Sequence, residues 1–242
     1  MKERILKKCL FIAFLIVIFM VVISIMLKYD VEGEKELPFS ISKILVVSTV
    51  DGKLNDDKEN IWNIGVTQVN DLYMYIDKSM IDEEQTIKEI RIENFTVNKA
   101  PTKGNIKVLR PTGEIANLYT HSEQDYLNDK IIYSGGVIDD LKSLEISNNG
   151  GILGFRIAVE NLGNYISNED EEITYDGKLL SNLGVTIPEI AFNISFDVII
   201  TTSENISFKG TINLNMPIEN VIEEGSSSKE ITDFSSVVFK RI

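Results

Sequence analysis

The sequence has little of the residues on which disulfide bonding and much enzyme chemistry depend, because its 242 residues include one cysteine and one histidine. The cysteine, Cys9, lies near the N-terminus within an apolar run. The long region that follows it therefore forms no intramolecular disulfide and must be stabilised by packing alone. That region is long enough for one domain with a sizeable core.

The scarcity of histidine argues against the commonest catalytic arrangements. A Ser-His-Asp triad needs a histidine that an acid positions, and the only histidine, His121, lies in the polar segment THSEQD. No serine lies in a G-x-S-x-G motif, and one histidine without a second soft ligand does not make a zinc site. We therefore interpret His121 as a solvated loop residue. The sequence predicts no catalytic, cofactor-binding or metal-binding residue and no enzyme activity.

Acidic residues are abundant, but their groupings match no known metal-binding motif. Two candidates for calcium are Asn55, Asp57 and Glu59 in LNDDKEN, and Glu169 to Glu172 in NEDEEI. An EF-hand loop would need glycine and glutamate where the first segment has Asn60 and Val66. We interpret both segments as solvated turns, and a calcium site built from several loops remains an alternative.

A carbohydrate-binding or carbohydrate-cleaving function would need a groove with aromatic side chains or two facing carboxylates. The candidate aromatic residues are Trp62, Tyr73, Tyr75, Tyr119, Tyr126, Tyr133 and Tyr165. Strand aromatics more often fill a core face than a ligand platform. We expect these residues in the core, whereas an exposed aromatic groove beside two carboxylates would favour the carbohydrate alternative.

One long hydrophobic run is present near the N-terminus. From Cys9 to Leu27, nineteen consecutive residues carry no charge. As a helix they would span roughly 28 Å, which matches the hydrocarbon core of a bilayer. A buried helix of a soluble protein rarely lacks polar residues for this long. We therefore predict one transmembrane helix that contacts the lipid bilayer from Cys9 to Leu27.

The same run differs from a cleaved signal peptide, which has a shorter apolar core and small residues at its cleavage site. Here Ser24 to Lys28 close the run without such a site. Cys9 precedes the apolar core, whereas a lipoprotein cysteine would follow it. We expect the helix to be retained as an uncleaved signal-anchor.

Charges on the two sides of the run predict its orientation. Lys2, Arg4, Lys7 and Lys8 precede it against one acidic residue. By the positive-inside rule the N-terminus is cytoplasmic and the remainder of the chain is extracytoplasmic. Of the 24 basic and 37 acidic residues, five and one lie at or before Lys28, which leaves a formal charge of −17 outside. That field favours solubility and argues against a nucleic-acid partner.

The clearest strand signal lies near the C-terminus. From Ile190 to Ile200, and again from Ile206 to Met216, hydrophobic residues alternate with mostly polar ones. This period of two is typical of a strand with one buried face. The short polar segment TTSEN separates the two runs. We predict an antiparallel hairpin that forms the centre of the core.

Weaker strand signals fill the rest of the extracytoplasmic region, at 39–50, 62–66, 72–76, 88–97, 106–109, 130–133, 144–146 and 152–159. The pair Asn149-Gly150 favours a tight turn between the last two, and a second tight turn is expected at 175–178. No long helical period occurs after the anchor. The sequence therefore predicts an all-β fold, an antiparallel β-sandwich or open barrel of about ten strands.

Three local features are also expected. Lys178 to Leu183 should form one helical turn that Gly184 stops, with Pro188 starting the next strand. Residues 223–229 should form a Gly/Ser-containing loop. The C-terminal residues should return as an edge strand that ties Val237 to Phe239 into the sheet.

Four segments, ELPFSISKILVVSTVDG, NDLYMYIDK, SLEISNNGGILGFRIAVENLGNY and EEGSSSKEITDFSSVVFKRI, together carry a resemblance. They look like uncharacterised single-pass membrane proteins of Gram-positive bacteria. The resemblance implies a bacterial, anchored and extracytoplasmic protein, and it implies no activity or cofactor. The excess of Ile, Asn, Lys and Glu agrees with a bacterial surface.

The expected organisation is a cytoplasmic tail over 1–8, a transmembrane helix over 9–27, a stalk over 28–36 and one β-domain over 37–242. We expect a non-enzymatic cell-envelope protein whose β-domain is an interaction or structural module and contacts a protein or the cell wall near its membrane. The first alternative is a carbohydrate-binding or carbohydrate-cleaving domain. The second is a divalent-ion-dependent sensor or adhesion domain.

Overall fold

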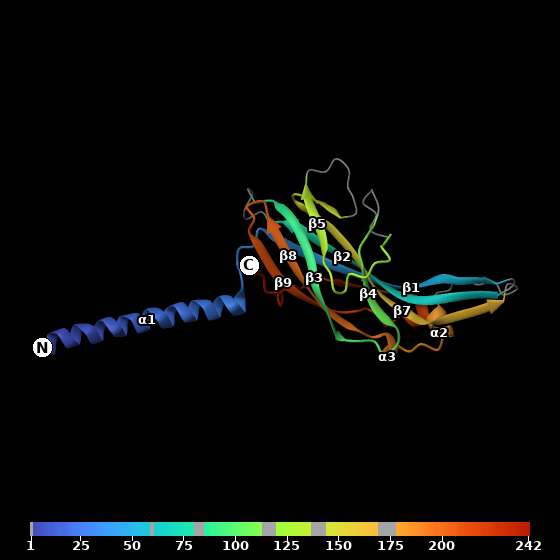
Figure 1. The fold of residues 1–242 in the computed structure, drawn as a ribbon, viewed down its shortest axis with the longest axis horizontal. Helices are drawn as coiled ribbons and strands as arrows, with labels where there is room; N and C mark the ends of the chain where they lie inside the picture. Colours follow the sequence, from blue (N-terminus) through green and yellow to red (C-terminus); the bar gives the residue numbers. More distant parts are fainter. Residues whose placement is uncertain (1, 59–60, 80–84, 113–119, 137–143, 169–177) are drawn as a thin grey trace.

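The structure is a computed structural model that describes residues 2–58, 61–79, 85–112, 120–136, 144–168 and 178–242. A long helix, α1 (Lys2–Glu32), leads into a β-rich region, and the two lie end to end along the long axis of the molecule (Figure 1). The far ends of the longest strands lie at the opposite extremity from the N-terminus. The molecule is therefore elongated, with an apolar helix at one end.

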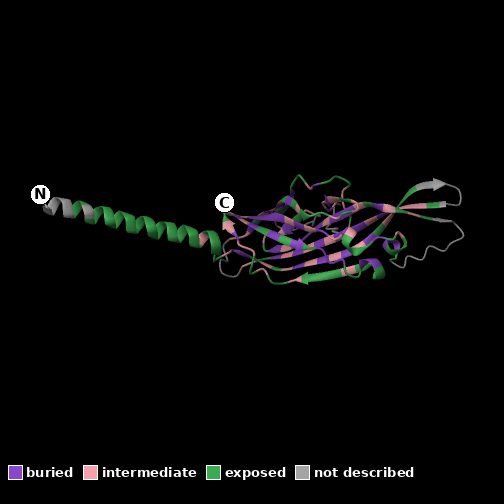
Figure 2. Cartoon of the chain, turned by 90° about the horizontal axis from the view of Figure 1, so that it is seen from below, coloured by how far each residue is buried: buried purple, intermediate pink, exposed green. Residues whose placement is uncertain are grey.

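Helix α1 is long and apolar enough to cross a membrane from Leu10 to Glu32. Its described side chains are almost all exposed, as Figure 2 shows. The predicted span from Cys9 to Leu27 lies within this helix. The helix continues through Lys28 to Glu32, the first part of the segment 28–36.

One large sheet forms the rest of the described chain. Its strands are β1 (Phe39–Lys58), β2 (Ile61–Lys78), β3 (Ile87–Lys99), β4 (Asn105–Leu109), β5 (Ile131–Gly136), β6 (Glu145–Ser147), β7 (Gly150–Asn168), β8 (Asn193–Thr202), β9 (Ser207–Asn215), β10 (Ser226–Ile231) and β11 (Lys240–Arg241). They lie in the order β10-β1-β2-β7-β6-β5-β3-β8-β9-β11, and β4 also pairs with β7. Strands β10 and β11 are the two ends of this path, so the sheet is not closed.

The sheet is mixed, because β5 and β6 run parallel while the other described strand pairs are antiparallel. The prediction of a purely antiparallel sheet is therefore wrong. Parallel neighbours cannot be joined by a tight turn and need a crossover connection. Residues 137–143, which follow β5 in the sequence, lie outside the described residues.

The two halves of the sheet face each other across one core. Phe155 on β7 packs edge-on against Phe95 on β3 and Phe196 on β8, with ring centroids 5.8 and 5.3 Å apart. The predicted C-terminal hairpin is confirmed, because β8 and β9 pair in continuous register. The alternation in sequence therefore marks the side chains that fill this core.

On the face of β8 away from these phenylalanines, Asp197 is buried among three donors. They are Lys209 Nζ at 2.7 Å from Oδ2, Thr211 Oγ1 at 2.6 Å from Oδ1, and Asn94 Nδ2 at 2.8 Å from Oδ2. Burial raises the pKa of the Asp197 carboxyl, but the hydrogen bonds outweigh burial and hold the pKa below its ordinary value. The folded state therefore favours the ionised carboxylate.

This lowered pKa of Asp197 predicts acid sensitivity. The stabilisation is fully present above the unfolded pKa of about 3.9 and is lost as the pH falls through the lower folded value. We expect the free energy of unfolding to fall more steeply for the wild type than for Asp197→Asn between about pH 4 and pH 2. Urea unfolding at several pH values checks this, with Asp77→Asn on an exposed position as the control. Parallel pH profiles for the wild type and Asp197→Asn would contradict it.

The C-terminal segment connects the two ends of the sheet. It forms β10, which pairs with β1, and β11, which pairs with β9. Between them Phe234 and Val237 pack partly buried against the core, and Phe239 is 5% exposed. The predicted return as an edge strand is confirmed, although the paired residues are Lys240 and Arg241.

The same segment contacts the end of α1. Three contacts join them: Glu34 N–H donates to Phe239 O at 2.8 Å, Arg241 N–H donates to Tyr29 Oη at 2.9 Å, and Lys240 Nζ lies 3.0 Å from Asp30 Oδ1. Gly33 has a positive φ of 68°, and a Cβ at this position would collide with the Phe239 carbonyl. Glycine is required for this close approach. Hydrogen bonds and an ion pair to the C-terminal segment therefore hold the helix to the β-rich region, in addition to the covalent connection.

Three short helices complete the described chain: α2 (Leu179–Asn182), α3 (Ile187–Ile190) and α4 (Val221–Glu224). The helical turn before Gly184 is confirmed. The prediction that Pro188 starts a strand is wrong, because Pro188 lies in the first turn of α3, where a missing N–H is tolerated. The loop predicted at 223–229 is also wrong, since α4 and β10 occupy that segment.

Candidate functional site

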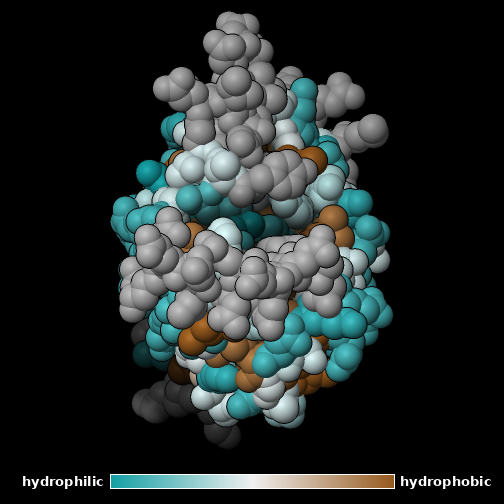
Figure 3. Space-filling view, turned by 90° about the vertical axis from the view of Figure 1, so that its right-hand side faces the viewer, coloured by the Kyte–Doolittle hydropathy of each residue, from teal (hydrophilic) through white to brown (hydrophobic). Residues whose placement is uncertain are grey.

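A polar cleft of about 550 Å³ lies in the half of the β-rich region away from α1. Its walls come from the far halves of β1, β2 and β7, from β4, and from the segment His121–Glu123. Figure 3 looks onto this end of the molecule and shows a hollow with hydrophilic side chains at its base. A cleft of this volume is in the range of small-ligand sites.

The floor of the cleft includes Arg156, which forms a partly buried ion pair with Asp71. These residues are directly opposed on β2 and β7. Arg156 Nε donates to Asp71 Oδ1 at 2.7 Å, and Nη2 donates to Oδ2 at 2.9 Å. Burial lowers the pKa of Arg156, but the hydrogen bonds and charge of Asp71 outweigh it, so the pKa lies above its ordinary value. The guanidinium therefore stays charged and orients as a fixed fork.

His121 lies against this pair, with its Nε2 atom 4.0 Å from Asp71 Oδ1. A short hairpin carries it there: Thr112 N–H donates to Thr120 O at 2.8 Å, and Ser122 N–H donates to Arg110 O at 2.9 Å. The His121 side chain is 3% exposed. Our interpretation of His121 as a solvated loop residue is therefore wrong, because the hairpin folds it down onto β2.

The walls of the cleft present charged and amide side chains in pairs. Lys107 Nζ lies 2.7 Å from Glu160 Oε2, and Lys53 Nζ lies 3.7 Å from Glu123 Oε1. Hydrogen bonding to Glu160 raises the pKa of Lys107. At the outer rim Asn55 Nδ2 donates to Asn164 Oδ1 at 3.1 Å. The cleft thus offers many hydrogen-bonding groups with nearly balanced charge.

Behind the floor, on the core side of β1 and β2, three polar side chains are fully buried. Ser48 Oγ and Gln68 Nε2 donate to Asn70 Oδ1 at 2.5 and 3.2 Å. Asn70 Nδ2 in turn donates to Ile157 O at 3.0 Å. These bonds join β1, β2 and β7 beneath the cleft, and buried polar groups of this kind keep a single register.

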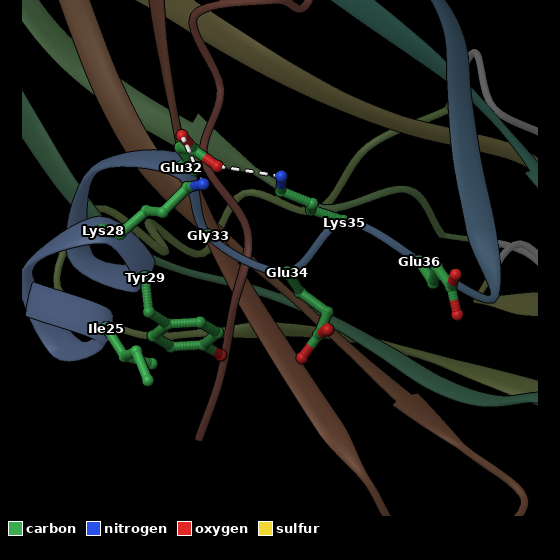
Figure 4. Close-up of a pocket in the computed structure, with 8 residues that line it drawn as sticks. All are labelled: Ile25, Lys28, Tyr29, Glu32, Gly33, Glu34, Lys35 and Glu36. Carbon is green, nitrogen blue, oxygen red and sulfur yellow. Dashed lines mark ion pairs between the residues drawn. The ribbon is translucent and has the colours of Figure 1, made fainter. Parts of the chain in front are cut away.

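A second hollow, of about 390 Å³, lies where α1 joins the β-rich region. Figure 4 shows that one continuous stretch of chain lines it and that Glu32 bridges Lys28 and Lys35. The Lys35–Glu32 pair is 3.0 Å long and the Lys28–Glu32 pair 3.9 Å. This hollow is lined by the last turns of α1 and by the residues that follow it, so we assign it to the junction between the helix and the β-rich region rather than to a ligand.

The aromatic residues singled out in the sequence do not gather at the cleft. Trp62 is 38% exposed near the far end of β2, and Tyr126 and Tyr133 are buried. Tyr73, Tyr75 and Tyr165 are partly buried, and Tyr119 lies outside the described residues. Among the described residues that line the cleft, none is aromatic. The expectation of core positions is confirmed for Tyr126 and Tyr133 and wrong for Trp62.

The two calcium candidates are only partly described. Asn55 lines the cleft, whereas Glu59 and the segment Glu169 to Glu172 lie outside the described residues. Within the described part of the chain, no group of three or more His, Cys, Asp or Glu side chains is arranged to hold a metal ion. The described residues therefore do not support the calcium alternative with a candidate site.

Comparison of the chain with protein families, with curated proteins and with solved structures finds no match in any of the three.

Proposed function

We propose that this chain is a membrane-anchored protein of the bacterial cell envelope whose extracytoplasmic β-domain is a binding module rather than an enzyme. The observation that carries the proposal is the polar cleft in the half of the β-domain away from the apolar helix. In this reading the N-terminus is cytoplasmic, α1 crosses the bilayer, and the unclosed sheet is an open β-sandwich.

The length of the strands supports a site held away from the bilayer. Strand β1 begins close to the end of α1 and contains 20 residues. At about 3.3 Å per residue it extends roughly 65 Å, and its far half lines the cleft. The fastening of α1 to Phe239, Lys240 and Arg241 favours a defined direction for this extension. The ligand is therefore met beyond the immediate surface of the membrane.

The chemistry of the cleft supports a polar ligand with little net charge. Its lysine and arginine side chains already pair with carboxylates, and asparagine amides form its outer rim. Hydroxyl and amide groups, such as those of a cell-wall glycan or its peptide, match these donors and acceptors. The Asp71–Arg156 pair is occupied internally, which favours binding over acid–base chemistry.

The carbohydrate-cleaving alternative has one favourable observation, the carboxylates of Asp51, Glu123 and Glu160 at the cleft. The described lining lacks the aromatic side chains on which sugar rings usually stack. Recognition of a glycan here would have to proceed through hydrogen bonds. We therefore favour binding of a wall polymer over its cleavage.

A co-sedimentation assay tests the proposed function. The full-length chain in lipid nanodiscs is mixed with purified Gram-positive wall fragments, and the bound fraction is measured against wall concentration. We expect saturable binding that Lys107→Ala weakens about tenfold, because a charged hydrogen-bond partner at the cleft is lost. The control, Lys229→Ala, removes the same charge from the exposed strand β10. The absence of wild-type binding, or equal weakening by both variants, would contradict the proposal.

A further inference from the structure

Strand β9 has an open edge along most of its length. On one side it pairs with β8 throughout, from Ser207 to Asn215. On the other side, among the described residues, β11 pairs only with Phe208 and Lys209. Figure 1 shows β9 along the lower border of the β-rich region. The stretch Gly210–Asn215 therefore ends the sheet on this side.

The backbone groups at this edge point outward at alternate residues. Ile242 N–H donates to Ser207 O from the β11 side, whereas Met216 N–H turns toward Phe192 O at the end of β8. Because successive residues of a strand point their N–H and C=O to opposite sides, odd-numbered residues face the open edge. The N–H and C=O groups of Thr211, Asn213 and Asn215 are thus directed away from β8.

This edge lacks the protection that the other open edges in the described part of the chain carry. Strand β10 has Lys229 and Glu230, and β1 beyond its pairing with β10 has Asp51 and Lys53. Strand β7 is irregular near its far end, where Asn161 and Gly163 have positive φ. The β9 segment GTINLN has no charge, no proline and no break in register. Proteins normally protect an exposed strand edge with charged residues, proline or a bulge, and this stretch of β9 has none of these.

The side chains of β9 extend an amide array to the edge. Asn98 Nδ2 donates to Asn193 Oδ1 at 2.8 Å, and Asn193 Nδ2 donates to Asn215 Oδ1 at 2.7 Å. Asn98 Nδ2 also lies 3.5 Å from Asn213 Oδ1. Thr211, Asn213 and Asn215 are exposed on this face, while Ile212 and Leu214 face the core. An added strand with amides on one face and apolar residues on the other would extend both the amide array and the apolar core face of β9.

We propose that β9 pairs antiparallel with β9 of a second copy of this chain, in the register that places Asn213 opposite Asn213 of the second copy. Thr211 then faces Asn215, and Ile212 faces Leu214, so that amides meet amides and apolar residues meet apolar residues. Each odd-numbered pair exchanges two hydrogen bonds, because both residues direct their backbone groups at the shared edge. No like charges meet, which makes this edge complementary to itself.

The geometry of this pairing has a consequence for the membrane anchors, which rests on the proposed function. Two antiparallel strands in a continuous sheet are related by a half turn about an axis perpendicular to the sheet. Figure 1 views β3, β8 and β9 nearly face-on, with α1 extending to the left. A half turn about the line of sight sends the second α1 to the right. The two α1 helices of the pair therefore extend in opposite directions.

Disulfide trapping tests the pairing in the full-length chain. In a Cys9→Ser background, the chain with Asn213→Cys is reconstituted in nanodiscs and oxidised gently. Directly opposed residues of this type lie about 5.5 Å apart at Cα, within the roughly 4.4–6.8 Å that a disulfide spans. We expect a covalent dimer that joins two nanodiscs, and none from the exposed control Ser228→Cys on β10. Equal yields from the two variants would overturn the proposal.

The register is tested by mixing two preparations made in separate nanodiscs, one with Thr211→Cys and one with Asn215→Cys. We expect the mixture to cross-link more than either preparation alone, because these residues face each other only in the proposed register. A mixture that cross-links no better than its components would overturn it. Lys107→Ala leaves the cross-linking unchanged, so failure of the cleft and failure of the edge can be told apart.

A backbone variant separates strand pairing from side-chain contact. Asn213→Pro removes an N–H that points to the open edge and leaves the β8 ladder intact, whereas Asn213→Ala keeps the N–H. By sedimentation velocity in nanodiscs we expect Asn213→Pro to weaken dimerisation about tenfold more than Asn213→Ala. Equal effects of the two variants, or a wild type that stays monomeric at every concentration, would overturn the proposal. Thermal melting checks that both variants fold. If Asn213→Pro does not fold, the disulfide yields of the cysteine variants test the pairing instead.

Discussion

Replacing Phe155 by alanine is expected to lower the free energy of unfolding by about 3–5 kcal/mol. The side chain is 1% exposed and lies between two other rings, Phe95 at 5.8 Å and Phe196 at 5.3 Å. Those rings belong to β3 and β8, in the opposite half of the sheet, so the cavity would open where the two halves meet. Urea unfolding of the chain in detergent, followed by near-ultraviolet circular dichroism, measures the loss.

A control for Phe155 lies three residues away on the same strand. Ile152 is 43% exposed on the other face of β7, so Ile152→Ala should change the unfolding free energy by less than about 0.5 kcal/mol. Phe155→Leu, which leaves a smaller cavity, should fall between the two. A Phe155→Ala variant as stable as Ile152→Ala would show that the halves of the sheet do not depend on this aromatic contact.

Alternation of side chains predicts the strands where one face is apolar. The hairpin of β8 and β9 is the best example, because its inward residues are nearly all Ile, Leu, Val or Phe. Strand β2 is a case in which alternation alone does not predict the full strand. We predicted two strands, 62–66 and 72–76, and the polar residues Gln68 and Asn70 lie between them. Both are fully buried at core positions, where Gln68 Nε2 donates to Asn70 Oδ1 and Asn70 Nδ2 donates to Ile157 O, so the strand continues.

The far half of β1 could not be predicted for a related reason. After Val50 the sequence DGKLNDDK contains a turn signal and many charges, and we ended the strand there. The segment is held as a strand by its pairing with β2 rather than by its own burial. Tertiary pairing overrides local propensity in this case. The cleft walls formed by this half of β1 were therefore not foreseeable from local pattern.

The candidate site itself was beyond sequence reasoning. Asp71 and Arg156 are 85 positions apart, and only the register between β2 and β7 places them opposite each other. A shift of one residue would turn each side chain to the core face. His121 was the single signal available, as the only histidine, but its burial depends on the hairpin that carries it. Long-range register thus decides the chemistry of the cleft.

The ion pair in the floor of the cleft leads to a second large expected effect. Side chains of Asp71 and Arg156 are 13% and 19% exposed, and two short hydrogen bonds join them. Removing one partner leaves the other charge poorly solvated. We therefore expect Arg156→Ala, and likewise Asp71→Ala, to lower the free energy of unfolding by about 3 kcal/mol. Chemical unfolding in detergent measures both variants under the conditions used for Phe155.

The double variant decides whether the pair acts as a unit. Once Arg156 is absent, the unpaired carboxylate of Asp71 already destabilises the folded state. The double variant should therefore lower the free energy of unfolding by about 2 kcal/mol less than the sum of the two single losses. Lys53→Ala is the control within the same cleft, because its pair with Glu123 is 83% and 95% exposed and should contribute nothing measurable. Strictly additive losses for Asp71 and Arg156 would show that the two side chains do not stabilise the fold as a pair. Additivity would then leave β2 and β7 held by their backbone ladder and core packing, with the cleft floor free to rearrange around a ligand.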